Sequence, residues 1–285
     1  MARIRATPRA ASGASVAAVF VPRFGPGISR FLSSGRSSPV VYLRTMAAFL
    51  LVWWLGSLAI DNPVLMPTPL AAAQALVDLT ANGELAQNIL VSLQRLAISF
   101  GLACIIGIPL GLIIGISVLA RDALEPLVEM LRPISGIAWV PLGLYFVGVG
   151  DALPILIMFY GAVFPLVLNT AAGVQSADRR LVDAARTLGV GRWLIFRQVL
   201  LPASFPNILV GARLAVGAAW MSMVAAEMIG APSGLGFAIE WYRELLMTPK
   251  MLAFVFTIGL LGYLLDRLLR AVQRTLTPWV PVANA

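Results

Sequence analysis

Few residues in this sequence have the types and spacing that catalysis needs. Histidine, the commonest general base and metal ligand, is absent. The one cysteine, Cys104, lies in an apolar run with no neighbour that would stabilise a thiolate. The one lysine, Lys250, does not follow the glycine-rich turn of an ATP-binding loop. We therefore expect no catalytic residue, no cofactor and no metal site, and a protein that is not itself an enzyme.

Charge is densest in one short stretch, "VDAARTLGVGRWLIFRQVLLP", from Val182 to Pro202. Three arginines and one aspartate make it too polar to cross a bilayer, although it lies in the middle of a very apolar chain. These residue types suit an interaction surface better than a reaction. The elements around the stretch decide where that surface lies.

Composition places the chain in a membrane. Hydrophobic residues make up 59% of the 285 residues, charged residues 12%, and mean hydropathy is +0.88, all far from the values of soluble domains. The net charge of +8 would suggest nucleic acid as a partner of a soluble protein. In a membrane protein, arginines report topology instead. We therefore expect membrane lipid, and no nucleic acid, among the partners.

Six segments are apolar and long enough to cross the hydrocarbon core, which takes about 20 residues of helix. The sequence thus predicts an all-α polytopic protein. The third segment, "RPISGIAWVPLGLYFVGVG", holds two prolines and four glycines, so we expect a broken helix buried in the bundle. Between the first two spans, amphipathic helices should lie at the surface. The predicted spans are 42–60, 92–118, 133–149, 154–174, 203–229 and 251–270.

The arginines also predict orientation, because cytoplasmic loops retain them and translocated loops do not. With both termini in the cytoplasm, the outer loops hold only Arg243 and Lys250. The chain is then a multi-pass protein of the cell inner (cytoplasmic) membrane. Residues 1–40 contain no acid and many Arg, Ser, Gly and Pro, so we expect a disordered basic cytoplasmic tail before a membrane domain at 41–280. The alternative is a tail that binds anionic lipid.

A glycine pattern in the second span concerns packing. Gly107, Gly111 and Gly115 follow a G-x3-G-x3-G spacing. Such a strip lets another helix approach closely, so we expect it to serve helix packing and not ligand binding.

The charged stretch predicts a short helix within a loop at about 176–202. Ser176 and Asp178 are typical helix-start residues, and Gly189 stands where a left-handed C-cap would end the helix. Small and apolar residues share one face of this helix: Leu181, Ala184, Ala185 and Leu188. One interpretation is a surface helix solvated among lipid headgroups. The other is a helix whose small apolar face docks on a partner.

Spacing favours docking. The loop reads Asp183-Ala184-Ala185, three residues, Gly189, nine residues, Val199, one residue, Leu201-Pro202. It resembles the EAA loop of ABC-importer permeases, E-A-A-x3-G-x9-I-x-L-P, with Asp in place of Glu and Val in place of Ile. One such loop between the fourth and fifth of six spans is a specific signal.

The resemblance extends from about Leu65 to Trp279 and is greatest to permeases of the nitrate, sulfonate and taurine importers, in particular the taurine branch. It implies a type I ABC-importer permease fold. The stretches that carry it are "SLQRLAISF", "GIPLGLIIG", "PISGIAWVPL", "VFPLVLNTAAGV", "VAAEMI", "GLGF" and "LTPW".

This resemblance implies a permease subunit of an ATP-driven importer of a small anion such as taurine, an alkanesulfonate or nitrate. Its partners would be a second permease copy in a homodimer, two cytoplasmic ATPase subunits that hydrolyse ATP, and an external (periplasmic) solute-binding protein. The short helix would be the coupling helix that docks on the ATPase, with coupling residues Asp183, Ala184, Ala185, Leu188, Gly189, Leu201 and Pro202. The alternative class is a secondary transporter or channel without an ATPase, which an inverted repeat and intramembrane acids would favour.

The fifth predicted span offers a candidate pathway. The residues Arg213, Gly217, Trp220, Val224 and Glu227 recur at intervals of four and three, so they share one side of a helix. In one interpretation this stripe is a wall of the transport pathway. In the other it is structural: Arg213 pairs with carbonyls or a neighbouring acid, and Glu227 lies near the outer interface, where burial costs little.

Overall fold

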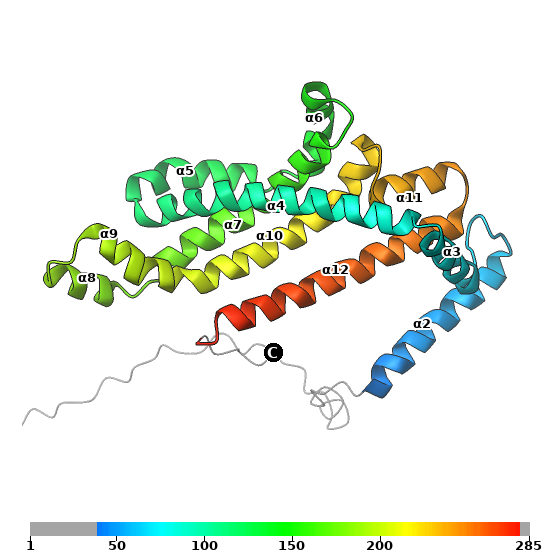
Figure 1. Cartoon of the computed structure of the whole chain (residues 1–285), viewed down its shortest axis with the longest axis horizontal. Helices are drawn as coiled ribbons and strands as arrows, with labels where there is room; N and C mark the ends of the chain where they lie inside the picture. The colour runs from blue at the N-terminus through cyan, green and yellow to red at the C-terminus, as the bar shows by residue number, and fades with distance from the viewer. Residues whose placement is uncertain (1–38, 280–285) are drawn as a thin grey trace, which may run out of the picture. The chain divides into compact units, whose positions relative to one another are not determined.

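The computed structural model describes residues 39–279. Over that range the chain forms helices joined by short connections and contains no strand (Figure 1). The predicted all-α class is therefore confirmed. The basic tail predicted for residues 1–40 lies outside the described residues, apart from Pro39 and Val40 at the start of the first described helix.

The chain divides into two units, residues 1–52 and 53–285. The described part of the first unit is the beginning of α2 (Pro39–Ile60), an apolar helix long enough to span a membrane. The second unit holds the helices that follow. They are α3 (Pro69–Ala81), α4 (Glu84–Ile116), α5 (Val118–Leu131), α6 (Val140–Val147), α7 (Ala152–Gln175), α8 (Arg179–Thr187), α9 (Arg192–Ile195), α10 (Leu201–Gly230), α11 (Leu235–Glu244) and α12 (Thr248–Leu276), with a 3₁₀ turn η1 (Gly136–Trp139) before α6 and a π-helical turn η2 (Phe196–Leu200) before α10.

Among residues 39–279, five helical segments are long and apolar enough to cross a membrane, and a bent pair of helices makes a sixth if it counts as one span. Five predicted spans correspond to α2, α4, α7, α10 and α12. The fifth is longer than predicted, because α9 and η2 join α10 in one run from Arg192 to Gly230. The predicted surface helix before the second span is α3, which buries Ala72, Ala75 and Leu79 on one face.

The third predicted span, 133–149, is a broken helix as expected, but its extent and its burial within the chain differ from the prediction. A separate helix, α5, occupies the segment expected to be a cytoplasmic loop, and the chain then bends by 86° into η1 and α6. The hydropathy pattern missed α5 because this amphipathic helix carries acids on its polar side, among them Glu125 and Glu129. The expected burial of the broken helix is not found in the chain, since Tyr145 and Phe146 of α6 are 85% and 74% exposed.

Helices α4, α7 and α10 form the centre of the second unit. α7 packs against both α4 and α10, and α12 packs against α10, α11 and α3. Figure 1 shows α8 and α9 at one end of this bundle and α3 and α11 at the other. Fully buried apolar side chains fill the space between the helices, among them Met158, Leu166, Met223 and Phe254. In a bilayer, such packing is stabilised by van der Waals contact, because lipid tails are as apolar as the helices.

The glycine strip of α4 lies directly against α7. A β-carbon at Gly111 would lie 2.6 Å from both Thr170 Cβ and Val167 O, and one at Gly115 would lie 2.6 Å from Val174 Cβ. No larger residue fits these positions unless the helices separate. The packing role predicted for this strip is confirmed.

Replacement of Gly111 by alanine is expected to destabilise the bundle by about 1–3 kcal/mol, as overpacking of a tight contact usually does. Gly101→Ala in the same helix is the matched control, because a β-carbon there meets nothing within 4 Å. The measurement is the midpoint of thermal aggregation of the detergent-solubilised protein. Equal midpoints for the two variants would contradict the contact.

Candidate functional site

The charged stretch folds into α8, its C-cap and α9. At the start of α8 the Asp178 carboxylate accepts a hydrogen bond from the backbone N–H of Arg180 at 2.9 Å. At its end the N–H groups of Gly189 and Val190 donate to the carbonyls of Arg186 and Ala185 at 2.9 and 3.0 Å. This is the Schellman arrangement, which needs a left-handed residue. Gly189 has a φ of +74°, so the predicted cap is confirmed.

The apolar face of α8 is uncovered in this chain. Leu181 is 59% exposed and Leu188 82% exposed, while Ala185 between them is half-buried. Trp193, in the adjoining α9, is 71% exposed. The carboxylate of Asp183 pairs with Arg186 at 3.4 Å, and both side chains are exposed. A large apolar surface therefore stands at the end of the bundle on a helix that is otherwise charged.

The other predicted coupling residues lie on both sides of this surface. Ala184 is exposed next to Ala185, whereas Leu201 and Pro202 form the first turn of α10. Pro202 has no N–H, and it directly follows the π-helical turn η2, where the N–H of Leu201 donates to the carbonyl of Phe196. The loop thus joins the exposed helix to a central helix of the bundle. Its docking role stays a prediction.

The stripe predicted on α10 faces two different neighbours. Arg213, Gly217 and Trp220 line a small cavity of about 50 Å³ against α12. There, Nε of Arg213 donates to Oδ1 of Asp266 at 2.8 Å, so the neighbouring acid that the sequence left open is Asp266. Glu227, farther along the helix, is fully buried against α4 and α11. The stripe as a pathway wall stays a prediction.

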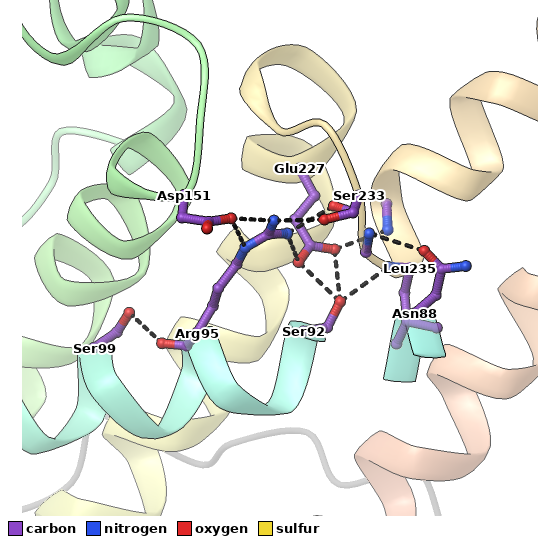
Figure 2. A network of polar contacts seen from close by, with 10 residues as sticks. Asn88, Ser92, Arg95, Ser99, Asp151, Glu227, Ser233 and Leu235 are labelled. Carbon is purple, nitrogen blue, oxygen red and sulfur yellow. Dashed lines mark hydrogen bonds and ion pairs between the residues drawn. The ribbon is translucent and has the colours of Figure 1, made fainter. Parts of the chain in front are cut away.

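Sequence patterns did not single out the most connected polar site of the molecule (Figure 2). Four polar residues of α4 share one face, since their separations alternate between four and three: Asn88, Ser92, Arg95 and Ser99. Arg95 lies at the centre and is 2% exposed. Its Nη1 lies 2.8 Å from Oε1 of Glu227, which is 0% exposed. Its Nε donates to Asp151, the residue before α7, at 3.0 Å.

Hydroxyl and backbone groups complete this ion pair. The Ser92 hydroxyl donates to the Glu227 carboxylate at 2.8 Å and accepts from the N–H of Leu235 at 2.9 Å. The N–H of Gly236 donates to the other carboxylate oxygen at 2.9 Å. The Ser233 carbonyl accepts from Arg95 at 2.7 Å. Buried charges are tolerated when hydrogen bonds satisfy them in this way.

The segment "SGLGF" has its glycines because Glu227 lies against it. A β-carbon at Gly234 would lie 2.5 Å from a carboxylate oxygen of Glu227, and one at Gly236 would lie 2.4 Å from the carbonyl of Val224. Gly234 also has a φ of +109°, a region that favours glycine. The network therefore fixes the connection between α10 and α11, and through Asp151 it reaches α7.

A second polar contact joins α11 to the start of α4. The hydroxyl of Tyr242 donates to the Glu84 carboxylate at 2.7 Å. Burial, together with this carboxylate, raises the pKa of Tyr242 to about 12. The hydroxyl thus remains a hydrogen-bond donor at any physiological pH.

Arg95 was missed because hydropathy averaged over a span hides a single charge. A signal was nevertheless present. An ionisable residue inside an apolar span is by itself a candidate site, and Ser92 and Ser99 flank Arg95 on the same helix face. Its partner Glu227 lies 132 residues away, so local spacing gives no indication of the pair.

Residues 107–278, more than half of the chain, match the family described as the binding-protein-dependent transport system inner membrane component. The chain belongs to this family. The permease is 34% identical to the taurine transport system permease protein TauC of Escherichia coli (strain K12), over 83% of this chain and 88% of that protein. It is 37% identical to the nitrate import permease protein NrtB of Leptolyngbya laminosa, over 67% of this chain and 68% of the relative.

A solved structure of inward-facing conformations of the MetNI methionine ABC transporter has a chain with the same fold. The TM-score is 0.55 at 22% sequence identity, with 68% of the permease and 98% of the MetNI chain covered. Together with the family match, this confirms the predicted ABC-importer permease fold. The family is one of transport permeases in the membrane and not of enzymes.

Replacement of Arg95 by glutamine is expected to destabilise the permease by about 3–5 kcal/mol, because Glu227 then keeps a buried charge without its partner. The double variant Arg95→Gln/Glu227→Gln should recover part of that loss, since neither charge remains in the core. Arg186→Gln is the control, because its ion pair is exposed and such pairs contribute about 0–1 kcal/mol. Thermal stability in detergent measures all three. A double variant less stable than Arg95→Gln would count against the network.

Proposed function

We propose that this permease is the membrane subunit of an ATP-driven importer of a small anion, such as taurine, an alkanesulfonate or nitrate. The relatives named for taurine transport and nitrate import support the solute class. The observation that carries the coupling is α8, a rigidly capped helix with an exposed apolar face and the spacing of an EAA loop. Two ATPase subunits would hydrolyse the ATP, and an external solute-binding protein would deliver the solute.

A second copy of the permease is proposed to cover the exposed side of η1 and α6. An apolar groove of about 350 Å³ lies there, and Leu142 and Phe146 on its rim are 48% and 74% exposed. The indole N–H of Trp139 in this groove is buried without a hydrogen-bond partner among the described residues. In a homodimer, the two grooves would face each other beside the transport route, because a two-fold interface repeats the same patch on both subunits.

The proposed mechanism follows from the connection between α8 and the bundle. When the ATPase subunits close, they would move α8, and the helical run from Arg192 to Gly230 would carry that displacement along the bundle. The 30 residues of α10 alone are about 45 Å long. Its far end holds Glu227 in the ion-pair network. A rigid helix held at both ends suits a rigid-body switch of the cavity between inward-facing and outward-facing states.

The α10 stripe is retained as a proposed wall of this route. Trp220 and Gly217 are among the residues that line the cavity against α12. Arg213 is the charged residue of the stripe that a passing anion would meet. Glu227 is the last residue of the stripe, and its carboxylate is paired with Arg95 in the buried network.

Both termini and α8 are proposed to lie in the cytoplasm, and residues 61–84 and 232–250 outside. The reason is that the segments assigned to the cytoplasm hold nearly all of the arginines. In a permease with Cys104 replaced by serine, Thr187→Cys should react with a membrane-impermeant thiol reagent only after permeabilisation. Thr80→Cys should react in intact cells. External labelling at position 187 would refute this orientation and the coupling scheme with it.

Gly189→Asp is expected to leave the permease inserted while ATPase subunits dissociate or hydrolyse ATP without transport. A side chain at φ +74° costs about 1–2 kcal/mol, and it stands in the docking surface. Gly191→Asp is the matched control, because Gly191 has a φ of −64° and the same open space around it. Ala185→Asp should act like Gly189→Asp, since it places a charge in the contact face.

The experiment purifies the whole complex, counts bound ATPase subunits and measures uptake into vesicles. The uptake probes are taurine, methanesulfonate and nitrate, with choline as a cationic comparison. Normal subunit retention and uptake in both Gly189→Asp and Ala185→Asp would reduce α8 to a solvated surface helix. Uptake of choline alone would overturn the proposed solute class and leave the coupling untouched.

A further inference from the structure

A cavity of about 480 Å³ lies beside the break between α5 and η1, where α7 and α10 pass. It is distinct from the small cavity beside Arg213. Two of its lining residues are polar, Arg132 at the break and Asn169 on α7. The others are Pro165, Leu168, Ala172 and Leu214.

Arg132 brings an unneutralised charge to this cavity. Arg95 is paired with two carboxylates and Arg213 with one, whereas Arg132 forms no ion pair with any described residue. The acids nearest to it in sequence on α5, Glu129 and Glu125, do not reach it within ion-pair distance. A guanidinium presents five N–H donors in a planar fork that matches carboxylate, sulfonate or nitrate oxygens. Arg132 is also an exposed residue, so its donors are accessible to water and to a ligand.

The backbone at Arg132 is held in place from two sides. Its N–H donates to the carbonyl of Val128 at 2.9 Å, which completes the last turn of α5. The hydroxyl of Tyr160 on α7 donates to the carbonyl of Leu131 at 2.6 Å. Pro133 then prevents the helix from continuing, because proline lacks the N–H and its ring clashes with the preceding turn. The break is thus tied to α7, and the arginine is presented at a fixed point.

Asn169 on α7 supplies a second donor among the lining residues. Its Nδ2 donates one N–H to the carbonyl of Pro165 at 2.8 Å, which leaves the other N–H of the amide for a ligand. Gly211 of α10 lies directly behind it, since a β-carbon there would be 2.7 Å from Asn169 Cβ. The asparagine is therefore backed by α10 and faces the cavity.

We propose that Arg132 and Asn169 bind the transported anion at this cavity, as a nitrate or sulfonate group. This inference rests on the proposed function and adds the groups that contact the solute. The leucines, Leu168 and Leu214, accommodate the carbon atoms of a sulfonate. One cation and one amide hold an anion weakly, and a transport site must release what it binds.

The experiment places a cysteine in the cavity by Leu214→Cys, in the full-length permease with Cys104 replaced by serine. Two thiol reagents of equal size are compared, 2-sulfonatoethyl and 2-trimethylammonioethyl methanethiosulfonate. The sulfonate reagent should react faster than the ammonium reagent by about tenfold, relative to the same pair at Leu70→Cys on α3, because one nearby cation attracts it. Methanesulfonate or nitrate should slow the reaction at position 214 and leave position 70 unaffected.

In the Leu214→Cys background, Arg132→Gln should abolish both the reagent preference and the protection, and Asn169→Ala should weaken the protection. Arg132→Lys keeps the charge, so it should retain the reagent preference and lose most of the protection. If Arg132→Gln fails to insert, Arg132→Lys still tests the role of the guanidinium. Arg274→Gln removes an exposed arginine at the end of α12 and should change neither. Preference and protection that survive Arg132→Gln, or that are lost in Arg213→Gln instead, would overturn the proposal.

The labelling needs neither ATP nor the ATPase subunits, so its outcome separates from that of the coupling experiment. Anion protection in a permease that retains no ATPase would support this site and contradict the proposed coupling. Normal ATP-driven uptake of taurine or nitrate without protection at position 214 would contradict this site alone.

Discussion

The buried ion pair between Arg95 and Glu227 is the interaction on which the arrangement of α4, α7, α10 and α11 depends. Transfer of a charge out of water costs several kcal/mol per ion even after relaxation, and the pair offsets this only when every other polar atom is also bonded. Ser92, Ser233 and the backbone of Gly236 meet that condition. Position 234 therefore has no room for a β-carbon, because the carboxylate of Glu227 lies against it. One electrostatic requirement thus determines the local sequence of a loop.

The same requirement has a mechanical consequence. α10 is fixed at one end by the ion pair and joined at the other to α9 and the capped helix α8. Between these ends it packs along α7, where Gly211 and Gly173 allow close contact. Small residues at such contacts let the backbones of the two helices approach closely. The buried network therefore lies at one end of a continuous helical run from Arg192 to Gly230, and the short connection at residues 188–191 joins the other end of that run to α8. In the proposed mechanism, a displacement imposed at α8 would act through this connection and this run.

The sequence predicted those features that local signals determine. The cap at Gly189 followed from the helix-ending role of glycine, and the close helix packing at Gly111 followed from a four-residue repeat, so each needed only a few neighbouring residues. The structure supplies the packing partner, α7. The spans α2, α4, α7, α10 and α12 followed from averaged hydropathy. The same averaging concealed Arg95 and the amphipathic helix α5, because it suppresses single charges and one-sided polarity. The pairing of Arg95 with Glu227 depends on tertiary contact across 132 residues, which no local pattern encodes.

Three arginines in membrane-spanning helices or at the break between them show how a partner decides the role of a charge. Arg95 is buried and paired with two carboxylates, so its charge is neutralised within the protein and links α4 to α10 and to the start of α7. Arg213 has Asp266, and its remaining field is that of a dipole. Arg132 is exposed at the break between α5 and η1 and has no counter-charge among the described residues, so water, lipid headgroups or an anion must stabilise its charge. A permanent acid of the protein at this position would compete with an anion for the guanidinium. At the proposed anion site, the solute itself would supply the counter-charge while it is bound.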